Sequence, residues 1–487
     1  MSSRKIIPII PVASAPGAPQ GVPVVEAANE EMVSLYEAQK KIYPRTVTGL
    51  FARWRWAFVF LTQLVFYGLP WLEWGQRQAV LFDLGARRFY IFGLVLYPQD
   101  FIYLTGLLVI SALSLFLFTA VAGRLWCGFA CPQTVYTEIF MWIERRTEGD
   151  RLKRMRLDEG PMSLEKFARK GAKHGLWLLV ALWTGFTFVG YFSPVRELGA
   201  GVASFALGPW ETFWILFYAF ATWGNAGFMR EQVCKYMCPY ARFQSAMFDA
   251  DTLIVTYDAA RGEPRGSRSR KAELAKLNLG SCIDCSLCVQ VCPTGIDIRN
   301  GLQYECIGCA ACVDVCDTVM DKMHYPRGLI RFSTQNALAT GGTSRQIWRR
   351  VLRPRVLVYT LLLGVVTLAL LGSLVLRTPL KVDVVRDRAS LSRIVDGGRL
   401  ENVYRLQIMN ATEKPQTYRI SAGGLEGLGV ASDTDVEVGP AESRWVPVRL
   451  QIPYGSAASG SHPVHIDVQA LGDSAHVSEK AVFLVPR

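Results

Sequence analysis

Residues 282–293 read C-I-D-C-S-L-C-V-Q-V-C-P, and the same cysteine spacing returns 24 positions later, from Cys306 to Cys316. Three closely spaced thiolates can hold three iron corners of a [4Fe–4S] cubane, whereas the fourth cysteine of such a run ligates the other cluster. The two runs therefore predict two [4Fe–4S] clusters. Cluster one would be held by Cys282, Cys285, Cys288 and Cys316, and cluster two by Cys306, Cys309, Cys312 and Cys292.

Structural zinc is the alternative use of so many cysteines. Zinc sites typically place two Cys-x-x-Cys pairs on either side of a longer loop, and duplicated runs of four cysteines fit that pattern poorly. Pro293 follows the first run, while Asp317 replaces the second proline, which alters the backbone more than the ligation. Two clusters in one small fold predict electron relay rather than bond-making chemistry.

Two Cys-x-x-x-Cys-Pro motifs precede these runs. The first holds Cys127, Cys131 and Pro132, and the second, 107 positions later, holds Cys234, Cys238 and Pro239. Cysteines at positions i and i+4 share one helix face, and the proline predicts a helix break directly afterwards. Four thiols could then converge between two helices, and soft thiolates select Cu(I), zinc or iron–sulfur clusters. The alternative is that these cysteines have only a structural use and pack as small buried residues.

Apolar runs outside the cysteine block predict a membrane protein. Mean hydropathy is +0.20, half of the residues are hydrophobic and only 19% are charged. Five runs are long enough to span a bilayer or nearly so: 56–72, 101–122, 175–192, 204–222 and 356–376. The shorter run 89–97 could lie at the interface. Buried helices of a large soluble protein would not explain five such runs with basic loops between them.

The basic residues set the expected orientation. Lys and Arg gather before the first span and in 145–173 and 230–355, as in cytoplasmic loops. The net charge of +12 therefore predicts membrane topology and no nucleic-acid partner. An odd number of spans then places the N-terminus and the clusters inside and the C-terminus outside.

This pattern predicts five regions. They are a partly disordered cytoplasmic arm (1–50), transmembrane helices one to four with both CxxxCP motifs (51–250), a cytoplasmic dicluster ferredoxin-like domain (251–345), a fifth transmembrane helix (346–378) and a periplasmic β-sandwich (379–487). The sandwich is predicted by alternating apolar residues in 403–409, 446–452 and 464–468. It contains no cysteine, which is compatible with an oxidising compartment.

The motif segments together are similar to those of a known family. The stretches GRLWCGFACPQTVYTEIFMWIERRTEGDR, REQVCKYMCPYARFQ and the double ferredoxin run resemble the CcoG/FixG/RdxA family of cytochrome c oxidase accessory proteins. The resemblance covers nearly the whole chain. It implies an immunoglobulin-like C-terminal domain and a bacterial inner-membrane location. It also implies reduction of Cu(II) to Cu(I) for assembly of cbb3-type cytochrome oxidase. The candidate catalytic and copper-handling residues would be Cys127, Cys131, Cys234 and Cys238.

The expected cofactors are therefore two [4Fe–4S] clusters and transient copper. The expected partners are the lipid bilayer, copper-delivery and oxidase-assembly proteins and a separate electron donor, since no GxGxxG or P-loop is present. Two other functions stay open. One is a quinol-linked membrane ferredoxin that conducts electrons without copper, and the other is a copper chaperone or assembly scaffold without redox turnover.

Four further residues have weaker claims to a function. Glu211 lies in an apolar run, where an acid is costly unless paired, functional or near the interface. His324 follows the second cysteine run and could tune that cluster, although a surface histidine is the simpler expectation. His462 and His465 lie on a predicted strand, where a separation of three places them on opposite faces.

Overall fold

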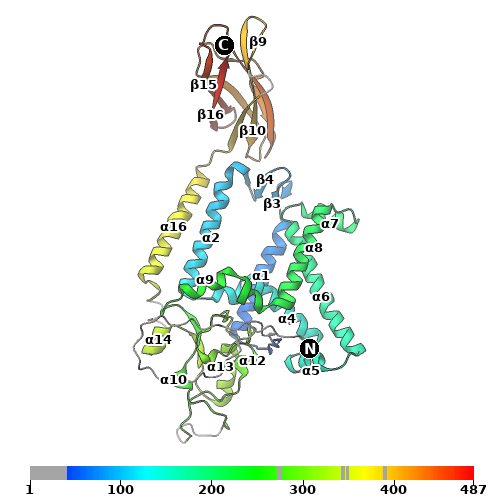
Figure 1. The fold of residues 1–487 in the computed structure, drawn as a ribbon, viewed down its shortest axis with the longest axis vertical. Helices are drawn as coiled ribbons and strands as arrows, with labels where there is room; N and C mark the ends of the chain where they lie inside the picture. Colours follow the sequence, from blue (N-terminus) through cyan, green and yellow to red (C-terminus); the bar gives the residue numbers. More distant parts are fainter. Residues whose placement is uncertain (1–40, 271–276, 342–345, 347–349, 388–391, 487) are drawn as a thin grey trace, which may run out of the picture. The chain divides into compact units, whose positions relative to one another are not determined.

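The computed structural model describes residues 41–486 apart from 271–276, 342–345, 347–349 and 388–391. Most of the arm expected over 1–50 therefore lies outside the described residues. From Ile42 onward the chain forms one compact unit, and the following description concerns that unit (Figure 1).

Three helices of the described residues are long and apolar enough to cross a membrane, by length and composition. They are α2 (Phe101–Ala122, extended by the turn η2, Pro98–Asp100), α6 (Leu164–Val189) and α16 (Pro354–Val375). Helices on the other two apolar runs fall outside this set. Helix α8 (Pro209–Gly224) has only 16 residues, and α1 (Leu50–Gly68) carries Arg53 and Arg55 in its first two turns, which lower its mean hydropathy.

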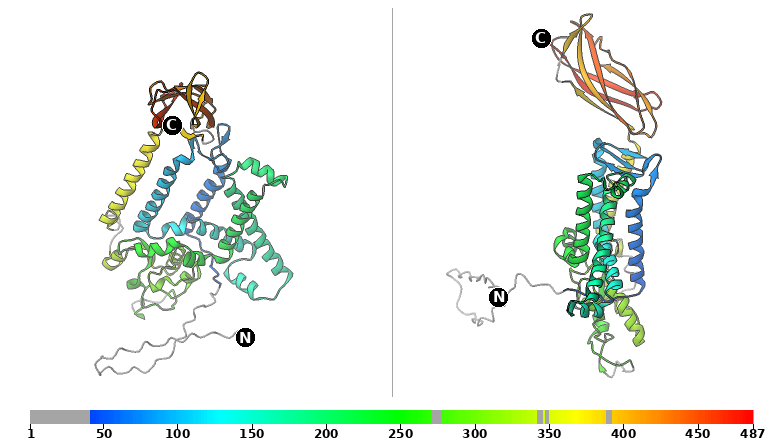
Figure 2. Two further views of the ribbon diagram at one scale, coloured as in Figure 1. Left: turned by 45° about the horizontal axis from the view of Figure 1, so that its top comes forward. Right: turned by 90° about the vertical axis from the view of Figure 1, so that its right-hand side faces the viewer.

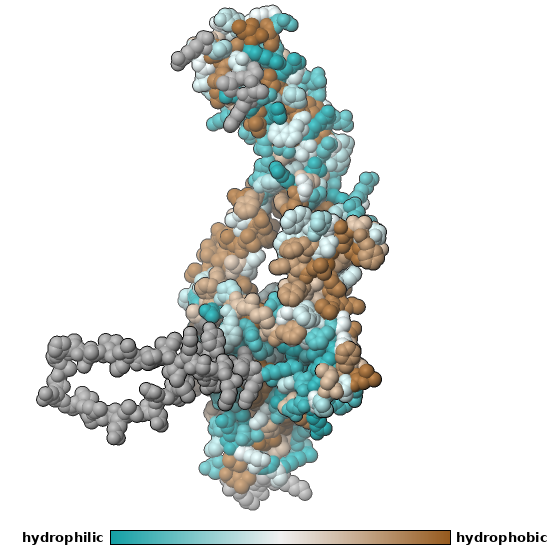
Figure 3. Space-filling view, turned by 45° about the vertical axis from the view of Figure 1, so that its right-hand side comes forward, coloured by the Kyte–Doolittle hydropathy of each residue, from teal (hydrophilic) through white to brown (hydrophobic). Residues whose placement is uncertain are grey.

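Small residues let the long helices pack closely. Helix α16 lies beside α2 (Figure 2), where the Tyr103 hydroxyl donates to the carbonyl of Ser373 at 3.1 Å. Helix α6 packs on α8, and a Cβ atom at Gly185 would collide with the carbonyl oxygen of Ile215. The outward faces are apolar, and hydrophobic residues gather over these helices (Figure 3). Leu368 on α16, for example, is 71% exposed.

Shorter elements connect the long helices. The run 89–97 forms most of two antiparallel strands, β4 (Arg88–Ile91) and β5 (Leu94–Leu96), and β4 also pairs with β3 (Val80–Asp83). These connecting elements are η1 (Leu69–Trp71), β1 (Glu73–Trp74), β2 (Arg77–Gln78), β3 (Val80–Asp83), β4 (Arg88–Ile91), β5 (Leu94–Leu96), α3 (Leu125–Phe129), α4 (Pro132–Thr147), α5 (Arg151–Glu159), α7 (Val195–Ala203), η3 (Asn225–Met229), η4 (Val233–Met237) and α9 (Pro239–Met247).

The segment with the eight ferredoxin cysteines folds around a two-stranded antiparallel sheet. Strands β6 (Ile254–Tyr257) and β7 (Ile330–Ser333) pair with Ile254 opposite Ser333. Helices α12 (Leu287–Gln290) and α13 (Ala311–Met323) pack against this sheet. Their shared core contains the buried apolar residues Val255, Val313, Met320 and Ile330. Smaller elements complete it: α10 (Ala259–Gly262), η5 (Ile298–Asn300) and α14 (Gln335–Thr340).

The C-terminal segment is a sandwich of two antiparallel sheets, ordered β12-β14-β10-β8, with β9 also on β10, and β13-β11-β15-β16. Alternate residues of the long strands enter one shared core, as the sequence pattern predicts. Tyr404 is fully buried there, and its hydroxyl donates to the Val482 carbonyl at 2.8 Å. The strands are β8 (Leu380–Arg386), β9 (Arg393–Val395), β10 (Arg399–Asn410), β11 (Gln416–Gly423), β12 (Gly429–Val430), β13 (Asp435–Val438), β14 (Ser443–Pro453), β15 (Gly460–Ala470) and β16 (His476–Val485).

Candidate iron–sulfur and thiol centre

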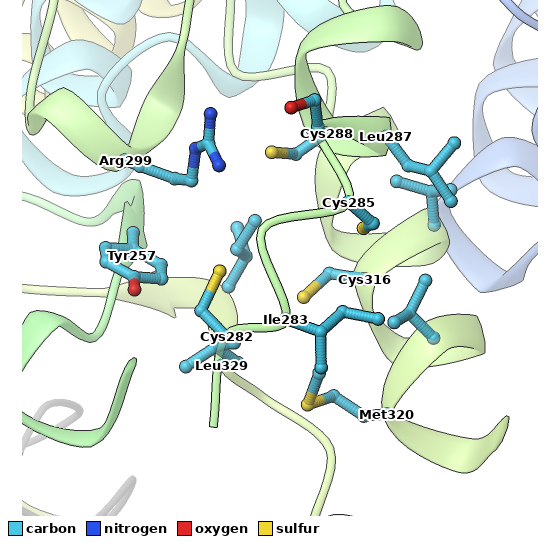
Figure 4. A pocket seen from close by; sticks show the side chains of 14 residues that line it. Tyr257, Cys282, Ile283, Cys285, Leu287, Cys288, Arg299, Cys316, Met320 and Leu329 are labelled. Carbon is cyan, nitrogen blue, oxygen red and sulfur yellow. The ribbon is translucent and has the colours of Figure 1, made fainter. Parts of the chain in front are cut away.

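One cavity is lined by the four cysteines that the spacing groups around cluster one, which we call the first cysteine site: Cys282, Cys285, Cys288 and Cys316. Cys282 and Cys285 lie on the loop before α12, Cys288 lies within α12, and Cys316 comes from α13. Their sulfur atoms turn toward a common space with Arg299 and Tyr257 at its edge (Figure 4). Cys285 is exposed, whereas Cys282 and Cys288 are buried.

A second cavity is lined by the other four cysteines, which we call the second cysteine site: Cys292, Cys306, Cys309 and Cys312. Cys292 follows α12, so each site takes three cysteines from one run and one from the other. Of the four cysteines of the first site, Cys288 alone is also among the residues that line this second cavity.

The two cysteine loops repeat one backbone conformation. Asp284 and Ser286 have φ values of 51° and 53°, and Gly308 and Ala310, at the equivalent positions of the second run, have 68° and 58°. Such left-handed residues turn the loop so that successive amides face inward, and they lead directly into α12 and α13. The sequence duplication is therefore also a structural duplication.

The donor sets of both cavities fit a [4Fe–4S] cluster, which is held by four thiolates. Burial raises the pKa of Cys288 to about 11 and of both Cys306 and Cys316 to about 12. Without a bound cation these thiols hold their protons, so loading must release them. In the described part of the chain, no three His, Cys, Asp or Glu side chains stand close enough to hold one metal ion. The thiols of each cavity surround a larger space instead.

The CxxxCP motifs differ from the sequence expectation in their local structure. Cys127 lies in the short helix α3, but Cys131 has extended backbone and caps the N-terminus of α4. Likewise Cys234 lies in the π-helix η4, and Cys238 caps α9. The prediction that each pair shares one helix face is therefore wrong. The proline after each second cysteine begins the next helix at its first position, where its missing N–H costs nothing.

The two motifs nevertheless meet in space and form what we call the CxxxCP quartet: Cys127, Cys131, Cys234 and Cys238. Burial raises the pKa of Cys234 to about 12, and the other three thiols oppose its ionisation further. Burial also raises the pKa of Cys127 to about 11, although the side chain of Gln244 partly offsets this. Gln244 is fully buried on α9, with its Nε2 3.4 Å from the Cys127 sulfur.

The quartet lies directly against the second cysteine site. Cys127 and Cys234 are partly buried and pack, together with Cys312, against a buried apolar cluster that contains Cys309. A Cβ atom at Gly128 would stand 2.8 Å from the backbone N and Cα of Cys309, so only glycine allows α3 to approach this loop so closely.

A buried ion network joins the chain segments that carry the two motifs. Glu144 on α4 is 2% exposed and pairs with Arg154 of α5 at 2.7 Å and with Arg230 at 2.5 Å. Arg230 lies between η3 and η4, just ahead of Cys234. Gln133, two residues after Cys131, donates to the Arg230 carbonyl at 3.1 Å. The helix after the first motif is thus fixed to the turn before the second.

Three polar residues of the centre were missed by sequence reasoning: Gln244, Arg55 and Arg124. Arg55 could have been noticed, because it lies one turn inside an apolar helix. At the sequence level it served only as one of the basic residues that indicate membrane orientation. Arg124 stands three residues before Cys127, on the reversal made by Gly123 with φ of 56°. Gln244 has no distinctive sequence signal, because its contact with Cys127 spans 117 positions.

The weaker candidates lie away from this centre. Glu211 is in the first turn of α8, where its Oε2 accepts from the Gly208 amide at 3.0 Å, so it stabilises a helix N-terminus. His324 ends α13 with a φ of 61° and is exposed. His462 bonds the Ala458 carbonyl, and His465 is exposed on β15.

Three family models match the chain in agreement with these segments. A 4Fe–4S binding domain covers residues 104–148 and a 4Fe–4S dicluster domain covers residues 229–335. A model described as the immunoglobulin-like fold at the C-terminus of FixG covers residues 370–486. The chain therefore contains ferredoxin-type 4Fe–4S domains and an immunoglobulin-like domain.

Curated relatives match over most of both chains. The nitrogen fixation protein FixG of Rhizobium meliloti is 40% identical over 422 residues, 80% of each chain. The proteins RdxA and RdxB of Cereibacter sphaeroides are 38% and 41% identical, over 88% and 82% of this chain and 92% and 85% of theirs. A solved FixG-related protein from Vibrio parahaemolyticus aligns with 22% of this chain and 97% of its own, at 22% identity and a TM-score of 0.21. This chain belongs to the FixG/RdxA family.

Proposed function

We propose that this protein is a membrane-bound iron–sulfur electron-transfer protein that reduces Cu(II) to Cu(I) at the CxxxCP quartet, for assembly of a cbb3-type cytochrome c oxidase. When bound, the [4Fe–4S] clusters of the two cysteine sites supply one-electron storage. Each Cu(II) takes up one electron and becomes Cu(I), and a separate one-electron donor must replace that electron. Cys127, Cys131, Cys234 and Cys238 would bind the copper ion during this step.

The observation that carries the proposal is the contact between the quartet and the second cysteine site. Cys127 and Cys234 pack against the apolar cluster that buries Cys309, and Cys312 packs against it too. An electron accepted at a thiolate site here need not cross solvent. Soft thiolates favour Cu(I) over Cu(II), so the quartet would also make reduction more favourable.

A cavity offers copper an approach to this contact. Its lining includes Cys234 and Cys309 together with the carboxylates Glu138 and Glu231 and the thioether of Met141. Carboxylates suit the harder Cu(II) ion, and sulfur suits Cu(I). Because no three of the described side chains are placed around one ion as they stand, the thiols must move when they bind it.

The proposed topology has five spans, with the cysteine sites in the cytoplasm and the sandwich in the periplasm. Helix α8 runs directly into η3, so the combined helix approaches the ~30 Å of a bilayer core. Its outward residues are apolar, and so are those of α1: Phe220 is 69% exposed and Leu64 is 74% exposed. The basic residues in 145–173 and 230–355 favour a cytoplasmic location for those loops.

To test the proposal, the protein is reduced with dithionite, the excess dithionite is removed, and Cu(II) is then added without oxygen. Electron paramagnetic resonance would follow the Cu(II) signal and the reduced iron–sulfur signal together. We expect both to fall one for one in the wild type. A variant with serine at all four quartet cysteines should keep its iron and lose this reaction, whereas the control Tyr236→Ser, at an exposed position of the second motif, should retain it. Equal rates in all three proteins would overturn the copper assignment.

The second candidate function is that of a quinol-linked membrane ferredoxin, which conducts electrons without copper. The ferredoxin-type protein NapH of Haemophilus influenzae is 26% identical over 201 residues, 40% of this chain and 57% of its own length. This match to a ferredoxin-type protein favours a general electron-transfer function. Reduction of the cysteine sites by quinol, with no effect of copper on their reoxidation, would favour this second function.

A further inference from the structure

Two buried arginines point at the carbonyl groups of the loop that carries the second cysteine site. Arg55 of α1 is 7% exposed and its Nη1 donates to the Cys309 carbonyl at 2.9 Å. Arg124 is 6% exposed, and its Nη1 bonds the Tyr304 carbonyl and lies 3.4 Å from that of Cys306. Its Nη2 donates to the carbonyl of Ala241 on α9 at 2.6 Å. Two positive charges thus lie directly against the loop of the second cysteine site.

These two charges are only partly offset. Among the described residues neither guanidinium forms an ion pair, and the Nε of each has no hydrogen-bond partner. Glu138 and Asp314 are near enough to act on Arg55. The Asp314 carboxylate also accepts the amides of Phe51 and Ala52 at 3.1 and 2.7 Å, which hold it at the start of α1. The charges in direct hydrogen-bond contact with the second site's loop are those of Arg55 and Arg124.

The first cysteine site has a different charge balance. Arg299 lies at its edge, but it pairs with Asp297 at 2.7 Å and with Asp284 at 2.5 Å. Arg268 donates to the Cys282 carbonyl at 3.2 Å, but it is only half-buried. Cys285 is exposed, so water also reaches this site. One arginine is neutralised by carboxylates and the other is screened by solvent.

We propose that Arg55 and Arg124 raise the reduction potential of the second cysteine site above that of the first, so that the exposed first site receives the electron and the buried second site holds it beside the quartet. Reduction adds one negative charge. Burial alone opposes that charge, whereas fixed positive charges in a poorly screened interior stabilise it. This order of potentials is useful to the protein only if electrons pass to the quartet, so the inference rests on the proposed function. The potentials themselves can be measured without copper.

The test is an anaerobic redox titration without copper, followed by electron paramagnetic resonance. The variant Cys285→Ser identifies the step that belongs to the first site, because it removes or moves only that step. In the wild type we expect the second site to be reduced at the higher potential. Arg55→Gln should lower the reduced-to-oxidised ratio of the second site about tenfold at a fixed potential, which is ~59 mV for one electron. Arg55→Lys should restore most of it, because the charge remains.

Arg299→Gln is the matched control, since it changes an arginine at the other site and should leave the second site's step in place. The inference is overturned if the first site has the higher potential in the wild type. It is also overturned if Arg55→Lys lowers the ratio as much as Arg55→Gln, because the guanidinium would then act through its geometry and not its charge. Should Arg55→Gln lose iron, the wild-type order of the two steps still decides. Copper plays no part here, so the result is independent of copper reduction.

Discussion

Gly128 shows how one residue can set the distance between two centres. It lies inside the first CxxxCP motif, and a side chain there would meet backbone atoms of Cys309, which cannot move aside as a flexible side chain can. Gly308 faces the same contact from the opposite side, where a Cβ atom would lie 3.1 Å from the backbone of Arg124. The quartet and the second cysteine site are close because both loops have glycine at this point.

Gly128→Ala should therefore separate α3 from the second cysteine site. Overpacking of this kind typically costs 1–3 kcal/mol, and here the strain falls on a ligand loop. We expect iron and labile sulfide per chain to fall toward the content of one cluster. Gly175→Ala is the control, because nothing lies within 4 Å of its added methyl group and the iron content should be unchanged. Equal iron in both variants would show that this contact does not support the site.

At the scale of elements, the buried Glu144 network holds α4, α5 and the turn before η4 together. Burial would raise the pKa of Glu144, but Arg230 and Arg154 outweigh it and lower that pKa below its usual 4.5. A carboxylate whose pKa is lowered by folding stabilises the fold above that usual value, and the contribution is lost as the pH falls below it. The network should therefore be intact at neutral pH.

Glu144→Gln would leave Arg154 and Arg230 buried without a counter-charge, at a cost of about 3–5 kcal/mol. We expect a clear drop in thermal stability in detergent, together with loss of the quartet's metal binding. Glu165→Gln breaks the exposed pair of Glu165 with Arg169, and should cost no more than ~1 kcal/mol. If the two variants melted at the same temperature, the buried network would not be what joins the two motifs.

At the scale of the whole molecule, the sequence predicted what depends on local patterns. The cysteine spacing anticipated which four cysteines line each cavity, and alternating apolar residues located strands β10, β14 and β15. The shape of the CxxxCP motifs was missed, because the chain reversal at Gly123 and the extended backbone of Cys131 before α4 depend on tertiary packing. Arg55 was missed for a similar reason, since its partner Cys309 lies 254 positions away. Contacts of that range leave no trace in spacing.

Copper reduction at the quartet is tested most directly by the ligands that hold copper after it has received its electron. One equivalent of Cu(II) would be added anaerobically to the pre-reduced protein, and the copper K-edge absorption spectrum would be recorded. We predict Cu(I) with sulfur neighbours in the wild type, and loss of those neighbours when serine replaces Cys127, Cys131, Cys234 and Cys238. Copper that stays Cu(II), or that shows the same ligands in both proteins, would contradict it.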